Sequence, residues 1–154
     1  MLSAIEQLDE LQGYVRAEEK LQPALVLLSA DFDVMPGLRN SVPYDDENGR
    51  PTDFANVEIN YLLKHRPPLA GVPAEELLAA NSAFFTRVEE LWDELGHRTI
   101  TRTVEQPFRV LRAQDPRDGF IIALKQGKIG NLWMTASSAP VLRTGATPPP
   151  PVWT

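Results

Sequence analysis

Two histidines, His65 and His97, are the first candidates for chemistry, because imidazole serves both as a metal ligand and as a general base. They lie in different parts of the chain, and neither stands in the HxxxH or HxxE spacing that gathers ligands on one helix face. The sequence contains no cysteine, which excludes thiolate zinc sites and disulfides. We therefore predict no metal site, and we expect both histidines at the surface, at the end of a helix or strand.

Paired carboxylates are the second candidates. Asp31 and Asp33 flank Phe32, and on a strand their side chains would point the same way, which suits general acid–base catalysis. The same residues also suit the end of a helix that enters a loop, and the sequence favours this second interpretation.

The acidic run Asp45–Gly49 has the superficial look of a calcium-binding loop. With Gly49 at the sixth position, positions one and twelve fall on Tyr44 and Ala55, which lack the required oxygen ligands. We predict a solvated acidic turn that binds no divalent ion.

Neither a nucleophile nor a phosphate site is predicted. Ser137 and Ser138 lack the G-x-S-x-G context of a nucleophile elbow, and residues 127–130 are typical of a hairpin turn. The predicted catalytic, cofactor-binding and metal-binding sets are therefore empty, and no cofactor is expected. Four aromatic residues could still wall an apolar pocket, although such residues at helical spacing more often belong to the core: Phe84, Phe85, Trp92 and Phe120.

The clearest element is an amphipathic helix over Ala74–Leu95. Pro73 in its first turn and Gly96 after its last apolar residue mark the two ends. The apolar residues recur at three- and four-residue steps and comprise Leu77, Leu78, Phe84, Phe85, Val88, Leu91, Trp92 and Leu95.

After Gly96 the hydrophobic period changes to two. Turns are predicted at Asp115–Gly119 and Gly127–Asn131, where proline and glycine favour tight bends. They separate four predicted strands, around residues 99–104, 108–113, 120–124 and 132–136. The sequence thus predicts an α+β fold in two layers, with amphipathic helices packed on one antiparallel meander sheet of about four strands.

The pattern before Ala74 is weaker. Leu2, Ile5, Leu8, Leu11 and Val15 predict an opening helix that Gly13 weakens, with Ser3 as its cap and Glu6 as the capping-box partner. A second helical piece is predicted over Pro23–Ser29 after a break at the proline, with a buried strand over Leu25–Leu28 as the alternative. Residues 31–56 are predicted to be irregular but ordered, and Val57–Lys64 to form a short helix.

Residues 1–143 are predicted to form a single domain, followed by a proline-rich tail over residues 144–154. The tail could extend as a semi-rigid spacer for a proline-reading partner. Alternatively, it could lie along the domain with Trp153 in an apolar groove. The sequence favours the docked alternative.

Composition excludes several function classes. A chain of 154 residues with 43% hydrophobic content is the size of one globular domain. Its net charge of −6 disfavours nucleic acid and anionic lipid as partners. No apolar run approaches the ~20 residues of a transmembrane segment, and the first residues predict a polar helix instead of a signal peptide.

The second half, about residues 84–141, carries a resemblance. The segments "LWDELGHRTITR", "RAQDPRDGFIIAL" and "GNLWMTASSAPV" together resemble small exported lipoproteins of actinobacteria. Those proteins have a similar helix ending in glycine, a "DG" hairpin and a closing strand with a Ser-Ser-Pro-Cys-like end. Here the closing segment has no cysteine, and no lipobox stands at the start. The resemblance implies a domain of the cell envelope without established catalysis.

Three functional hypotheses follow. The first is a non-enzymatic accessory or binding domain, associated with the cell envelope, that meets another protein through its surface. The second is a cone-shaped α+β domain whose apolar pocket binds or turns over a small molecule. The third is a cytosolic inhibitor or immunity-type partner with an acidic face. An enclosed cavity of roughly 300 Å³ or more with converging polar groups would favour the second hypothesis.

Overall fold

Each of two helices precedes a run of strands in the computed structural model, which describes residues 7–154. The expected roles of Leu2, Ser3, Ile5 and Glu6 therefore lie outside the described residues. The elements run in the order α1 (Glu10–Leu28), β1 (Phe32–Asp45), β2 (Pro51–His65), α2 (Ala74–Glu94), β3 (Arg98–Glu105), β4 (Phe108–Gln114), β5 (Ile121–Gln126), β6 (Leu132–Ser137) and β7 (Val141–Leu142).

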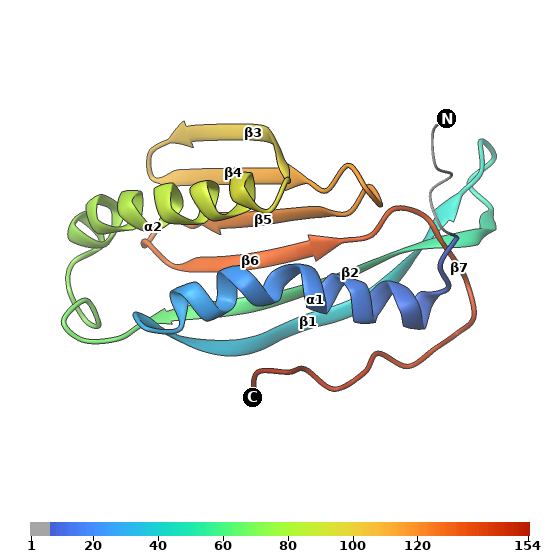
Figure 1. Ribbon diagram of the computed structural model, residues 1–154, viewed down its shortest axis with the longest axis horizontal. Coiled ribbons are helices and arrows are strands. Elements are labelled where there is room, and N and C mark those ends of the chain that lie inside the picture. Colours follow the sequence, from blue (N-terminus) through green and yellow to red (C-terminus); the bar gives the residue numbers. More distant parts are fainter. Residues whose placement is uncertain (1–6) are drawn as a thin grey trace.

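One antiparallel sheet joins all the described strands in the order β1-β2-β6-β5-β4-β3, and the short β7 also pairs with β2. Both helices lie on the same face of this sheet, α1 over β2 and β6 and α2 over β3 and β4 (Figure 1). The prediction of a two-layer α+β fold is confirmed. The prediction of about four strands was an undercount, because β1, β2 and β7 extend the meander to seven strands.

The predicted long helix is α2. Pro73 stands at its N-cap position, one residue before the first turn, and Gly96 follows its C-terminal end with a φ of +85°. Val88 and Trp92 are buried against the sheet, whereas Leu95 at the end of the apolar stripe is exposed. The helix therefore begins and ends where its proline and glycine indicate.

The predicted meander is β3 to β6. Between β4 and β5 the amide of Gly119 donates to the carbonyl of Asp115 (2.8 Å), and Gly119 has a φ of +76°. Between β5 and β6 the amide of Gly127 donates to the carbonyl of Asn131 (2.9 Å). Both predicted turns are confirmed.

The first helix differs from its prediction. α1 begins at Glu10, directly after the N-cap residue Asp9, which accepts a hydrogen bond from the amide of Gln12 and forms a capping box with that residue. It continues as one helix through Pro23, because the apolar residues on either side of the proline remain packed on the sheet. The predicted break at Pro23 and the alternative strand over residues 25–28 are wrong. Leu11 and Val15 are exposed, and the buried residues of the helix are Glu10, Gly13, Tyr14, Ala17, Glu18, Leu21, Ala24, Leu25 and Leu28.

The segment predicted as irregular is a long hairpin formed by β1 and β2. The helix predicted over residues 57–64 is also wrong, because Val57, Ile59, Tyr61 and Leu63 alternate as the buried side of β2. β1 is an edge strand of the sheet, where proline is tolerated. Pro36 and Pro43 lie at its two shifts of register.

Gly13 permits close packing of α1 on the sheet. A Cβ atom at this position would lie 2.9 Å from Cγ2 of Val57 and 3.2 Å from Cγ1 of Val141. From the sequence, Gly13 was expected only to weaken the helix. Its absent side chain instead brings α1 directly against β2 and β7.

The proline-rich tail returns along α1 (Figure 1). Trp153 is half-buried and packs against the hydrophobic core, as the docked alternative expected. Among the described residues, neither helix has a stretch long and apolar enough to cross a membrane.

Candidate functional site

An apolar groove of about 400 Å³ lies at the end of the sheet where β2 passes into α2. Two of its residues, Met35 and Leu62, face each other across β1 and β2, and both are more than 40% exposed. Ile129 on the opposite wall is 67% exposed. The remaining lining is mostly apolar and comprises Leu63, Lys64, His65, Leu69, Ala70, Gly71, Leu77, Asn131 and Leu132.

The wall that carries Ile129 is fixed against α2 by a glycine. Gly130 has a φ of +83°, and a Cβ atom there would lie 2.7 Å from Cβ of Leu77. The side-chain amide of Asn81 also donates to the carbonyl of Gly130 (2.9 Å). The β5–β6 turn is thereby held in place, and the exposed Ile129 is presented on a rigid support.

A buried chain of polar side chains lies behind the groove. Asn81 donates to Gln126 (2.9 Å), and Gln126 donates to the carbonyl of Pro107 (2.7 Å). Since the carbonyl oxygen of Asn81 only accepts, Nε2 of His65 donates to it at 2.8 Å. His65 is thus a buried, hydrogen-bonded residue, and its predicted surface position was wrong.

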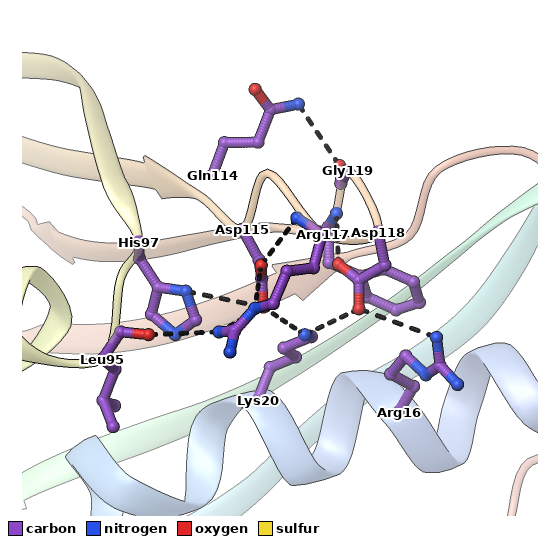
Figure 2. Close-up of polar contacts among 10 residues, drawn as sticks. Arg16, Lys20, Leu95, His97, Gln114, Asp115, Arg117, Asp118 and Gly119 are labelled. Carbon is purple, nitrogen blue, oxygen red and sulfur yellow. Dashed lines mark hydrogen bonds and ion pairs between the residues drawn. The ribbon is translucent and has the colours of Figure 1, made fainter. Parts of the chain in front are cut away.

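A second candidate is the charge cluster of Arg16, Lys20, His97, Asp115, Arg117 and Asp118, which borders an open depression of about 440 Å³ (Figure 2). Lys20 projects from α1 toward the β4–β5 turn, where its Nζ lies 2.5 Å from Asp115 and 2.6 Å from Asp118. Arg117 donates to both oxygens of Asp115, through Nε (2.8 Å) and Nη2 (3.0 Å).

The carboxylates of the charge cluster are saturated. Burial alone would raise the pKa of Asp115, but hydrogen bonds from Arg117 and Lys20 outweigh burial and hold that pKa well below its ordinary value. Each oxygen of Asp115 accepts from at least two donors, and Asp118 accepts from the amide of Phe120 (3.1 Å) and from Lys20. Neither carboxylate is free to act as a base, so the cluster serves to lock α1 to the meander.

His97 is the uncharged member of the charge cluster. It is buried, which corrects its predicted surface position, and burial lowers its pKa despite the nearby carboxylate of Asp115. Its Nδ1 lies 3.6 Å from Asp115 Oδ2 and makes no hydrogen bond among the described residues. The imidazole therefore fills space beside the ion pairs in its neutral form.

A third polar network holds the tail. Tyr61 donates to Glu18 (2.5 Å), and Arg39 donates to both. Burial and the hydrogen bond to Glu18 raise the pKa of Tyr61 to about 12, so the phenol remains a neutral donor. The amide of Val152 donates to Glu18 and to Tyr61, each at 3.1 Å.

The four candidate aromatic residues are all buried between the helices and the sheet. Phe84 packs edge-on against Phe32, with ring centroids 4.7 Å apart. Phe85 lies under the guanidinium of Arg109 (4.8 Å) and borders a cavity of only about 30 Å³. Trp92 and Phe120 are each 1% exposed. These side chains fill the space between the two layers.

Two other candidates have structural partners. Asp31 and Asp33 are paired with separate arginines, Arg87 (3.5 Å) and Arg66 (2.8 Å). The hydroxyl of Ser138 is buried and accepts from the amide of Val57 (3.0 Å). Each of these side chains therefore makes a structural ion pair or hydrogen bond within the domain.

The acidic run forms the turn of the β1–β2 hairpin, as predicted. Asp46 accepts from the amides of Asn48 (2.8 Å) and Arg50 (3.0 Å). No group of three or more His, Asp or Glu side chains within residues 7–154 is arranged to hold a metal ion.

Apart from His97 and His65, the residues of the charge cluster and of the groove were not candidates in the sequence, because each set comes from distant segments. The one available signal was the "DPRD" turn, where an aspartate precedes proline and can accept from the amides that follow. For the groove, the signal was Ile129, an apolar residue placed between two turn glycines.

No protein-family model, curated protein or solved structure matches the chain.

Proposed function

We propose that this protein is a non-enzymatic accessory domain that binds a partner protein through the apolar groove at the end of the sheet. This proposal is based on the exposure of Met35, Leu62 and Ile129 around one groove of about 400 Å³. Contiguous exposed apolar patches mark interaction sites in soluble domains, because leaving them in water is unfavourable.

The filling of the space between the layers supports a surface function. Trp92 and Phe120 occupy the region where a cone-shaped fold would keep its internal pocket. The groove instead opens outward and has one cationic side chain, Lys64, in its lining. It suits an apolar segment of a partner protein with an acidic flank. Association with the cell envelope rests on the resemblance of residues 84–141 alone.

Affinity capture from the envelope and cytosolic fractions of the native host, with purified variants as bait, tests this proposal. Leu62→Glu and Ile129→Glu place a charge in the groove at exposed positions, where folding is little affected. Val26→Glu is the matched control, because Val26 is 60% exposed on α1 and lies outside the groove lining. We expect a partner that wild type and Val26→Glu retain and that both groove variants lose.

The captured partner is then titrated against each variant by calorimetry. A loss of tenfold or more in affinity with Leu62→Glu, corresponding to about 1.4 kcal/mol, supports the groove as the binding surface. A partner that binds all variants equally contradicts it.

The volume of the groove also favours a second candidate, an apolar small molecule held near His65 and Lys64. A thermal-shift screen with fatty acids of different chain length separates the two. Saturable stabilisation of wild type that disappears in Leu62→Glu, without a groove-dependent protein partner, would replace the first proposal with the second.

A further inference from the structure

The tail is held at its two ends by hydrogen-bond acceptors of the domain. At the first end, Glu10 accepts from the amides of Thr144 and Gly145, the latter at 2.8 Å. At the second end, Glu18 and Tyr61 share the amide of Val152 (3.1 Å each). Glu10, Glu18 and Tyr61 therefore lie next to the backbone N–H groups of the tail and accept hydrogen bonds from them.

The residues between these ends have a matching chemistry. Pro148–Pro151 carry no backbone N–H and need no acceptor, and a polyproline segment is already extended before it docks. Little conformational entropy is lost when such a rod binds. The surface along α1 thus supplies acceptors at two separated points, and three of the four prolines between them, Pro148, Pro149 and Pro151, are half-buried.

The recognition at the second end depends on tryptophan and on a backbone amide. The indole Nε1 of Trp153 donates to Oε1 of Gln22 (2.8 Å), and the ring packs against the hydrophobic core. The side chain of Val152, in contrast, is 63% exposed. At this end the surface therefore recognises the backbone N–H of one residue, whose side chain is free to vary, and the indole of the next residue.

We propose that this surface, formed by Glu10, Glu18, Gln22 and Tyr61, is a binding site for proline-rich segments ending in Pro-x-Trp, and that it takes such a segment from a partner protein when the chain's own tail leaves. It is separate from the apolar groove and does not depend on the function proposed for it. The hydrogen bonds involve only backbone N–H groups and one indole, so a segment of another chain with the same chemistry makes them equally well.

The covalent link makes the tail a competitor of any such partner. A short linker holds its segment at an effective concentration of about millimolar, so a free segment must compete against that value. The apparent dissociation constant of an external peptide equals the intrinsic constant divided by the share of molecules whose site is open. The tail thereby sets a threshold for partner binding.

The probe is a fluorescently labelled peptide with the sequence of residues 144–154, added to the full-length chain and followed by fluorescence anisotropy. In wild type the site is occupied by the tail. Trp153→Ala in the protein removes the indole anchor of the tail and leaves the receptor residues intact. We expect this variant to bind the peptide about tenfold more tightly than wild type, the ratio for a site that is closed in nine molecules out of ten.

Two altered peptides test the contacts one at a time. N-methylation at the valine removes the N–H group from which Glu18 and Tyr61 accept. Replacement of the tryptophan by alanine removes the indole. Both peptides should lose at least tenfold in affinity for the Trp153→Ala protein. Gln22→Ala, made in the Trp153→Ala background, should weaken the native peptide but leave the alanine peptide unchanged.

Absence of binding to a Trp153→Ala protein that retains the wild-type near-ultraviolet circular dichroism of its buried Trp92 overturns the proposal. Equal binding of the native, N-methylated and alanine peptides overturns it as well, because the contacts of the tail would then not be the ones recognised.

Discussion

The ammonium group of Lys20 lies 2.5 Å from Asp115 and 2.6 Å from Asp118, so one side chain of α1 pairs with both carboxylates of the β4–β5 turn. The two partners Lys20 and Asp115 are 95 positions apart in the chain. Asp115 is 1% exposed, and Lys20 is largely buried. This contact ties the first helix to the meander through charges that are partly shielded from water.

Replacement of Lys20 by methionine should lower the free energy of unfolding by about 3 kcal/mol, because it leaves buried carboxylates short of a partner. Arg87→Met is the matched control, since the Arg87–Asp31 pair is more than 40% exposed on both sides and should contribute at most about 1 kcal/mol. Urea denaturation measures both values. Equal small losses in the two variants would show that the charge cluster does not lock α1.

Acidification from pH 7 toward pH 5.5 should destabilise the protein through His97. Burial lowers the pKa of the folded imidazole below its ordinary value of 6.5, so the unfolded chain takes up the proton first. The stability contributed by the neutral form is present above pH 6.5 and is lost as the pH falls. His97→Gln should flatten this slope, whereas Arg98→Gln at the neighbouring exposed position should leave it unchanged. A slope that is equally steep in His97→Gln would assign the effect to other groups.

Trp92→Ala should cost about 3–5 kcal/mol, because it removes a fully buried indole and leaves a cavity between α2 and the sheet. Chemical denaturation with Leu38→Ala as an exposed control provides the comparison. A midpoint unchanged by Trp92→Ala would be incompatible with the buried face of α2.

Gly13→Ala should destabilise the protein by about 1 kcal/mol, although alanine is the better helix former. The gain in helix propensity is about 1 kcal/mol, and overpacking against Val57 costs roughly 1–3 kcal/mol. A double-mutant cycle with Val57→Ala should show a favourable coupling, since the smaller side chain makes room for the new methyl group. Stabilisation by Gly13→Ala alone would contradict the close contact of α1 and β2.

Trp153→Ala should lower the free energy of unfolding by about 1–3 kcal/mol, the range for burial of one large side chain. Val152→Ala is the control, because that side chain is exposed.

Acrylamide quenching of Trp153 should increase as the pH falls below 4.5, the ordinary pKa of Glu10. Burial would raise this pKa, but hydrogen bonds from Ser41 and from the amides of Thr144 and Gly145 lower it in the folded chain. Protonation of Glu10 therefore weakens the hold on the tail. Quenching of Trp153 that is as strong at pH 7 as at low pH would show that the tail is not docked.

The second half of the fold could be predicted because its local and global signals agree. The three- and four-residue period of α2 and the period of two in the meander are bounded by proline and glycine at the correct positions. The hairpin of β1 and β2 was missed because Pro36 and Pro43 have the look of loop residues. Only the position of β1 at the sheet edge, a tertiary property, makes them compatible with a strand.

The buried face of α1 could not be read from the sequence because two apolar stripes compete there. Leu11 and Val15 suggest one face, yet the sheet selects the face of Tyr14 and Leu21, where Gly13 allows the closest approach. The charge cluster was equally inaccessible. Arg16 and Lys20 stand four residues apart on α1, and Asp115, Arg117 and Asp118 share one turn, but the two groups meet only through the docking of α1 on the β4–β5 turn.

Pairing of β6 with β2 makes folding of this sheet a non-local event. Leu63 lies opposite Leu132, so the connection between them must close a loop of roughly 70 residues before the two strands meet. The strands β3 to β6, in contrast, follow one another through short turns and can associate first. We expect the β1–β2 hairpin and α1 to join a preformed meander in the rate-limiting step, on the millisecond-to-second timescale of sheets rich in distant contacts.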